Sequence, residues 1–178
     1  MDQALSQLRK RYGSVPLLRP VLPMADFSPV NGKRRAEVAM AIRRPTDAFL
    51  LQTKAFYPPA TFRIPTGGIK KDEDVDHALL REVHEESNLT VEIERAIAVI
   101  DHTMPDGRAV FRTYLFLLRE TGGLLKVNDP KERISGWSER DIAGLRSAIS
   151  QLRALEGSWQ HWGSFRAVPL GVLVDALD

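Results

Sequence analysis

The stretch that decides the fold covers residues 67–89 and reads GGIKKDEDVDHALLREVHEESNL. Its paired glycines predict a turn. The acidic run at residues 72–74 suits a helix start, because acidic side chains cap the first turn and complement the helix dipole. The spacing of the apolar residues that follow predicts an amphipathic helix. At about 100° per residue, Glu85 and Glu86 project to either side of Glu82, so three carboxylates form one narrow patch.

This carboxylate patch continues the apolar stripe of the predicted helix. Val75, Ala78 and Leu79 lie within about 60° of Glu82 in projection, so the carboxylates should face the core. An inward carboxylate needs a partner because an unpaired buried charge is costly, and a hard cation such as Mg²⁺ prefers oxygen ligands. The alternative is a solvated helix end, but its acidic face would oppose the apolar stripe. The pattern therefore favours a cation site.

The same residues resemble the Nudix box of the Nudix hydrolases. That motif has a glycine, five residues, a glutamate, seven residues, and then R-E-apolar-x-E-E-x-G-apolar. Eight of the specified positions match, namely Gly67, Glu73, Arg81, Glu82, Val83, Glu85, Glu86 and Leu89. Asn88 replaces the last glycine, and asparagine is the next choice after glycine for a left-handed residue that ends a helix.

The resemblance implies a fold and a metal site. The expected fold is α+β, a Nudix-type α/β/α sandwich with a mixed sheet between helices. Metal binding falls to Glu82, Glu85 and Glu86, with the carbonyl oxygen of Gly67 as a further ligand. The expected metal is Mg²⁺ or Mn²⁺, which would bind phosphate oxygens and help to activate water.

The candidates for catalysis or for positioning are Glu85, Glu86, Arg81 and Glu132. Glu85 is expected to double as the general base. Arg81 is expected to orient a carboxylate through its fork of donors, the alternative being an ordinary helix ion pair. Glu132 resembles the further acidic residue that a later loop often supplies in the family, and a structural role is its alternative.

The implied reaction is hydrolysis of a pyrophosphate linkage in a nucleoside diphosphate linked to another group. ADP-ribose, nucleotide sugars, nucleoside triphosphates and dinucleoside polyphosphates all stay open as substrates, because the box fixes chemistry rather than specificity. The competing hypothesis is a catalytically silent Nudix-like domain that binds nucleotides or regulates. The complete carboxylate set favours the enzyme, because a binding module would not need it.

Candidate substrate-binding residues flank the box. Phe56, Tyr57 and Phe62 precede it and could form a nucleobase pocket. Arg63 is a further substrate-binding candidate, and His102 near a predicted hairpin could reach a phosphate. Near the C-terminus, three aromatic residues suit either base stacking or packing, and packing is favoured. These are Trp159, Trp162 and Phe165.

Composition narrows the other expectations. The 178-residue chain has no cysteine and a formal net charge of +2, which excludes disulfides and thiol catalysis and gives little support for nucleic acid binding. No apolar run reaches membrane-spanning length, so we expect a cytoplasmic protein, and a homodimer is compatible with the sequence. We expect one domain over residues 1–178, with residues 1–30 and 157–178 as extensions packed on it.

The other predicted elements follow from turn and capping signals. Helices are expected at residues 3–12, after a Ser138 cap as far as Gly157, and from Pro169 onwards. Strands are expected at residues 36–43, 48–54, 89–100, 110–119 and 124–127. Turns are expected at residues 28–32, 104–107 and 121–123.

Overall fold

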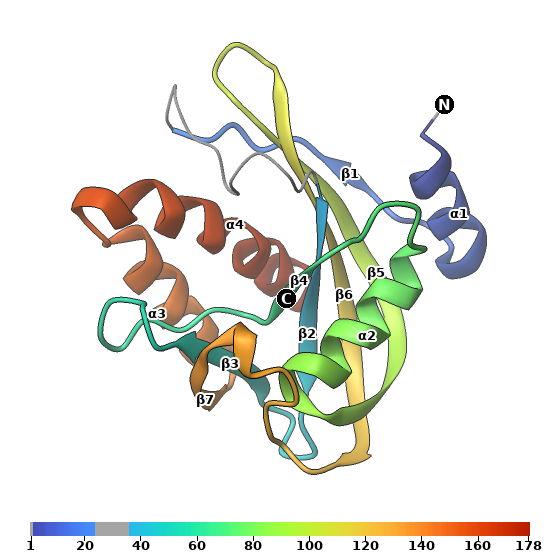
Figure 1. Cartoon of the computed structure of the whole chain (residues 1–178). Coiled ribbons are helices and arrows are strands. Elements are labelled where there is room, and N and C mark those ends of the chain that lie inside the picture. The colour runs from blue at the N-terminus through green and yellow to red at the C-terminus, as the bar shows by residue number, and fades with distance from the viewer. Residues whose placement is uncertain (1, 24–35) are drawn as a thin grey trace.

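A seven-stranded mixed sheet lies between two layers of helices in the computed structural model, which describes residues 2–23 and 36–178 (Figure 1). The strands are β1 (Leu17–Leu18), β2 (Ala36–Arg43), β3 (Phe49–Lys54), β4 (Thr66–Gly68), β5 (Leu89–Thr103), β6 (Ala109–Gly123) and β7 (Ile134–Arg140). The helices are α1 (Gln3–Tyr12), α2 (Val75–Ser87), α3 (Ile142–Arg153) and α4 (Gln160–Leu177), with short 3₁₀ turns η1 (Pro130–Glu132) and η2 (Gly157–Trp159). The predicted α/β/α sandwich is confirmed.

The central strand β2 supplies side chains to both layers. The sheet order is β1-β5-β6-β2-β3-β7, with β4 paired to β2 off this path. Val38, Met40 and Ile42 pack into the core under α1 and α2, and Ala39 and Ala41 pack into the core under α3 and α4. Because alternate residues of a strand point to opposite faces, β2 is apolar almost throughout and buried on both sides.

Helix α2 begins and ends close to where its sequence predicts. The Asp74 side chain caps the start by accepting a hydrogen bond from the backbone N–H of Asp76. Asn88 ends the helix in the left-handed conformation, with φ of 56°. The Asn88 backbone N–H also donates to His84 O. The helix therefore lies across the sheet with defined ends, which fixes the positions of the side chains on its last two turns.

The N-terminal residues that the structure describes pack closely on the domain. Leu5 and Leu8 of α1 are buried in the core beside α2. Arg11 at the end of α1 pairs with Asp74 and Asp76 at the start of α2, at 3.0 and 2.8 Å. The strand β1 then adds an edge strand to the sheet by pairing in parallel with β5. The turn predicted at residues 28–32 lies outside the described residues.

The region before α3 differs from the sequence prediction. Ser138 does not cap a helix; it lies in β7, where it pairs with Leu51 of β3. The N-cap of α3 is Asp141, whose Oδ1 accepts from the Gly144 N–H at 2.8 Å. The spacing of Ser138 and Asp141 resembles that of a capping box. Residue Ser138 instead pairs with β3 as part of β7, so the helix starts later. The predicted turn at residues 121–123 is also wrong, because these residues extend β6 opposite the start of β5, and no strand is assigned at residues 124–127.

The last helix begins well before its predicted start. Pro169 is an internal residue of α4, not its first-turn residue. A proline inside a helix costs about 3 kcal/mol, so the preceding turns must be held by packing. Phe165 and Ala167 are fully buried, and a Cβ on Gly163 would lie only 2.1 Å from the Leu152 carbonyl oxygen of α3. This close approach of α4 to α3 stabilises the early turns.

Candidate functional site

Two box carboxylates point inward from α2, as the helical projection predicts. Glu82 and Glu86 are 5 % and 1 % exposed, whereas the Glu85 side chain is 32 % exposed. Burial raises the pKa of Glu82, and it raises the pKa of Glu86 to about 7, with Arg63 and Lys54 opposing the shift at Glu86. Both carboxylates are therefore costly to hold in charged form without a cation.

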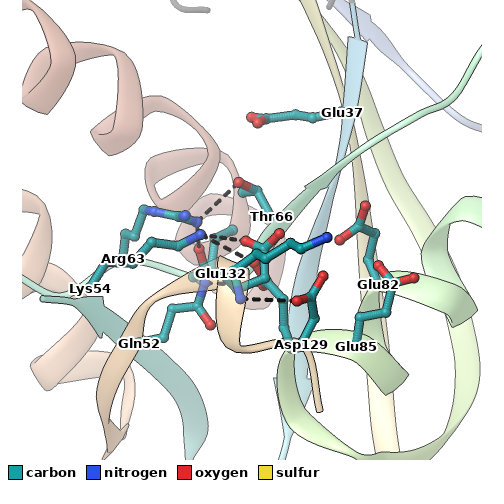
Figure 2. Close-up of polar contacts among 12 residues, drawn as sticks. Glu37, Gln52, Lys54, Arg63, Thr66, Glu82, Glu85, Asp129 and Glu132 are labelled. Atoms are coloured by element: carbon teal, nitrogen blue, oxygen red, sulfur yellow. Dashed lines mark hydrogen bonds and ion pairs between the residues drawn. The ribbon is translucent and has the colours of Figure 1, made fainter. Parts of the chain in front are cut away.

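A third carboxylate joins these two from a distant part of the chain. Glu132 in η1 offers an oxygen atom that lies within 4.8 Å of ligand atoms on Glu82 and Glu86. Figure 2 shows Glu132 between Arg63 on one side and Glu82 on the other. Three carboxylates that converge in this way are a suitable oxygen ligand set for a divalent cation. Glu85 is not a member of this group.

A lysine at the end of β3 places its positive charge beside the carboxylates. Lys54 Nζ lies 2.6 Å from Glu132 Oε2 and 3.6 Å from Glu86 Oε1. Two residues earlier on the same strand face, buried Gln52 donates from Nε2 to Glu86 Oε2 at 3.0 Å. The end of β3 therefore partly neutralises and orients the acidic group.

The first glycine of the box allows the sheet to approach α2 closely. Gly67 is in β4, opposite Val38 of β2, so this segment is a short strand and the predicted turn there is wrong. A Cβ on Gly67 would lie 2.0 Å from Glu82 Cδ, a distance that no side chain tolerates. The absence of a side chain at Gly67 therefore leaves room for the Glu82 side chain. The carbonyl oxygen of Gly67 stays a predicted metal ligand.

Arg81 connects the ends of the box. Its guanidinium bonds Glu73 through Nε at 2.7 Å, and its Nη1 bonds Glu82 at 2.7 Å and Glu85 at 2.9 Å. Nη2 donates to the carbonyl oxygen of Gly68 at 2.9 Å. The guanidinium lowers the pKa of Glu73 to about 2. Arg81 thus has the geometry of an orienting residue, because one nitrogen holds two of the box carboxylates.

A pocket opens beside the carboxylates. Its volume is about 210 Å³, and Glu82, Glu132 and Gly67 line one wall. On the other wall, the phenol of Tyr57 accepts a hydrogen bond from Arg63 Nε at 2.8 Å, and its ring lies 4.6 Å from that of Trp162. Phe56 also lines the pocket and is 46 % exposed. The pocket thus has an acidic wall and a wall that combines aromatic rings with cations.

Helix α4 contributes to this second wall. Trp162 and Arg166 are four residues apart, so they share one helix face, and both line the pocket. Arg166 Nη1 bonds the two carboxylate oxygens of Glu37 at 2.7 and 2.9 Å. In Figure 2, Glu37 lies apart from the carboxylates of α2. The packing role predicted for the C-terminal aromatics applies to fully buried Phe165, whereas Trp162 reaches the pocket.

Two predicted substrate-binding residues lie outside the pocket lining. His102 is fully buried, and its Nε2 lies 3.0 Å from Thr113 Oγ1, which in turn donates to Glu37. Burial lowers the pKa of His102 to about 4, with the charge of Glu37 opposing the shift. A buried neutral imidazole cannot meet a phosphate directly. Phe62 packs against the core beneath α3 and α4.

Sequence reasoning missed several residues of the site. Lys54 and Gln52 precede the box by more than ten residues, and Glu37 and Arg166 are 129 residues apart. No local pattern connects them to the acidic helix. A weak signal exists only for Lys54 and Gln52, because polar residues at every second position at the end of a buried strand indicate one face of a site.

Comparison with known proteins identifies the class. The NUDIX domain model matches residues 33–161, so the chain belongs to the Nudix family and is a Nudix hydrolase. Mouse diphosphoinositol polyphosphate phosphohydrolases 3-alpha and 3-beta are each 28 % identical over 127 residues, which cover 71 % of this chain and 73 % of theirs.

Solved structures show the same fold. An ADP-ribose pyrophosphatase from Streptococcus suis superimposes with a TM-score of 0.53 at 20 % identity, over 82 % of this chain and 92 % of that one. A UDP-X diphosphatase superimposes with a TM-score of 0.53 at 14 % identity, over 84 % and 66 % of the two chains. Within the described part of the chain, no helix is long and apolar enough to cross a membrane.

Proposed function

We propose that this chain hydrolyses a diphosphate linkage in a nucleoside diphosphate derivative and that it requires a divalent cation, Mg²⁺ or Mn²⁺. The observation that carries this proposal is the convergence of Glu82, Glu86 and Glu132 within 4.8 Å, with Glu82 and Glu132 also lining a pocket. The same pocket holds the cationic side chains of Lys54 and Arg63. An acidic group beside basic groups suits a bound cation next to phosphate oxygens.

The residues present fit such a cation. Glu86 Oε1 is buried and accepts no hydrogen bond from any described residue, although Lys54 Nζ lies 3.6 Å away. Glu82 and Glu86 would hold the cation from α2, and Glu132 would hold it from η1. When bound, the cation supplies positive charge that neutralises phosphate oxygens and promotes attack by water.

The chain's own residues have separate roles in the proposed reaction. Lys54 would bind phosphate oxygens on the basic side of the pocket, where it now neutralises Glu86 and Glu132. Glu85, which Arg81 holds at 2.9 Å and which is partly exposed, would accept the proton of the attacking water. The oxygen of that water forms the new bond to phosphorus as the bridging P–O bond breaks, and the leaving phosphate departs with the bonding electrons.

The aromatic wall supports a nucleoside as one end of the substrate. Tyr57 and Trp162 present rings from different elements, and base stacking on such rings contributes about 1–3 kcal/mol. The cavity of about 210 Å³ is smaller than the 300–1,000 Å³ of pockets that enclose a whole drug-sized ligand. The pocket would therefore enclose the diphosphate and one flanking group, with the rest of the substrate extending outwards.

A product assay tests this proposal. The full chain is incubated with Mg²⁺ or Mn²⁺ and with ADP-ribose, a nucleotide sugar, a nucleoside triphosphate, a dinucleoside polyphosphate or a diphosphoinositol polyphosphate. Reaction in ¹⁸O-labelled water identifies the phosphorus that is attacked. We expect cleavage that a chelator abolishes and that Glu86→Gln and Glu85→Gln both reduce strongly.

Other outcomes would point elsewhere. Tight binding of a nucleotide without cleavage of any substrate would favour the silent nucleotide-binding domain. Cleavage that neither substitution reduces would refute the proposed site even though the enzyme class holds. Chelator-resistant cleavage would refute the cation requirement.

A further inference from the structure

The loop that follows β6 is fastened to the C-terminal end of α2. The backbone N–H of Lys126 donates to Ser87 O at 3.1 Å, and those of Asn128 and Asp129 donate to Glu85 O at 3.0 and 3.1 Å. The last carbonyl groups of a helix have no partner within the helix, so these donors satisfy them. The loop therefore caps the helix that carries two of the three converging carboxylates.

Two asparagine side chains close this contact. Asn128 Nδ2 donates to His84 O at 2.9 Å and to Asn88 Oδ1 at 2.9 Å, which uses both amide hydrogens. Asn88 Nδ2 in turn donates to Leu124 O at 2.8 Å. We call Asn88 and Asn128 together the asparagine latch.

The latch explains the one departure from the box motif. Asn88 has a φ of 56°, in the left-handed region where the motif has glycine. Glycine would give the same backbone conformation at lower cost, but it has no side chain to bond Asn128 or Leu124. Asparagine keeps the helix end and adds two hydrogen bonds to the loop.

Asn128 of the latch lies four residues before Glu132, and backbone hydrogen bonds hold the segment that connects the two. Asp129 Oδ1 accepts from the Lys131 N–H at 2.9 Å, and Asp129 O accepts from the Glu132 N–H at 3.1 Å. Just beyond, Arg133 O accepts from the Ala55 N–H at 2.9 Å, which ties the loop to the end of β3. Glu132 is thus held between an anchor on α2 and an anchor on β3.

We propose that Asn88 and Asn128 are positioning residues that hold Glu132 at the separation from Glu82 and Glu86 that a divalent cation needs. This inference rests on the proposed function, because it takes the three carboxylates as the cation site. Glu132 is the one member of that group outside α2, so its loop must be ordered before or during binding. A latch that orders the loop in advance removes this entropic cost from cation binding.

The test measures the affinity of the full chain for Mn²⁺ alone, from the electron paramagnetic resonance signal of the free ion. We expect Asn128→Ala and Asn88→Gly each to weaken Mn²⁺ binding about tenfold, as loss of a partner behind a ligand typically does. Asn88→Gly is the informative variant, because it keeps the left-handed helix end and removes only the two side-chain hydrogen bonds of Asn88. Leu124→Ala is the matched control and should bind Mn²⁺ as the wild type does, because the Leu124 side chain is 74 % exposed and the substitution keeps the backbone carbonyl that accepts from Asn88.

The same substitutions are repeated in a Glu132→Gln background. If the latch acts through Glu132, the latch substitutions should no longer change Mn²⁺ affinity in the Glu132→Gln background. An equal loss of Mn²⁺ affinity in both backgrounds would show a general effect on the fold and would overturn the inference. Latch substitutions that leave Mn²⁺ affinity unchanged in the chain with Glu132 would also overturn it. If the wild-type chain bound no Mn²⁺, the proposed function itself would fail. Reduced affinity with an unchanged melting temperature separates positioning from unfolding.

Discussion

The two walls of the pocket are encoded in different ways. The acidic wall includes Glu82, and Glu86 lies buried behind it; both come from one helix, where their positions follow from a local repeat of about 3.6 residues. The opposite wall combines the end of β3, the loop after it and one face of α4, and contributes Lys54, Tyr57 and Trp162. This contrast indicates that two of the three converging carboxylates are specified by one short segment, whereas the wall proposed to bind the nucleoside depends on long-range packing.

The largest expected effect comes from removing a charge from the converging carboxylates behind the acidic wall. Glu86→Gln should lower turnover about 10²–10³-fold, because it removes a charge from the proposed cation site. The metal-free variant should be as stable as the wild type or more so, since an amide avoids the cost of a buried charge. Steady-state hydrolysis and thermal melting test the two parts.

The matched control for this substitution is Glu156→Gln on the exposed surface before η2. Unchanged turnover in Glu86→Gln would remove Glu86 from the mechanism. A large loss of stability without metal would show that the Glu86 charge holds the fold together.

The next effect concerns the support behind the opposite wall, where His102 contacts the Thr113 hydroxyl that bonds Glu37. The pKa of His102 is about 4, against about 6.5 in an unfolded chain. The native state therefore binds fewer protons between these values, and stability falls as the pH drops from 6.5 to 4. The full loss is about 3 kcal/mol, because each tenfold difference in proton affinity between the two states contributes about 1.4 kcal/mol.

Urea unfolding of the wild type and of His102→Gln at pH 7, 6, 5 and 4 measures this dependence. Carboxylates titrate in both proteins, so the difference between the two curves isolates His102. We expect the wild type to lose more stability than the variant as the pH falls. Parallel curves would mean that His102 accepts its proton without cost.

A third substitution adds one methyl group to the acidic wall. Gly67→Ala places a Cβ 2.0 Å from Glu82 Cδ, so the glutamate or β4 must move. We expect cation affinity to fall about 10–100-fold, the range found when a ligand loses its support. Gly122→Ala is the control, because a Cβ there meets no atom within 4 Å. Isothermal titration with Mn²⁺ should separate the two, and equal affinities would show that Glu82 does not need its present position.

The smallest expected effect sharpens the contrast between the walls. Trp162→Ala should raise the KM of a nucleoside diphosphate substrate about tenfold, at the lower end of the loss expected for a stacked base, with little change in kcat. Trp159→Ala is the control, since Trp159 contacts the Trp162 ring at 5.2 Å but does not line the pocket. A fall in kcat with unchanged KM would place Trp162 in the reaction rather than in substrate binding.

Much of the fold is readable from the sequence because its elements carry strong local patterns. The apolar run of β2, the β5–β6 hairpin around residues 104–107 and α2 itself are all close to the structure. The errors arise where tertiary packing overrides a local signal. Ser138 imitates a helix cap but completes a strand pair, and Pro169 imitates a helix start but lies inside α4 because contact with α3 holds the earlier turns.

The candidate site divides in the same way. The inward direction of Glu82 and Glu86 follows from the helical repeat, and the Nudix resemblance pointed to Glu132. The exposure of Glu85 was not predicted, because projection alone does not show where the covering layer ends. The partnership of Glu37 with Arg166 depends on how α4 meets β2, which no spacing in the sequence encodes.

The burial of β2 on both faces also affects how the chain can fail to fold. A shift of one residue in its pairing would send Val38, Met40 and Ile42 to the opposite core and bring the alanines into their place. The same shift would move Gly67 from opposite Val38 and so displace Glu82. A chain trapped in that register would lose both its tight packing and its carboxylate geometry. This misfolded chain would unfold readily and would therefore be degraded by proteases. It would not accumulate as a stable but inactive protein.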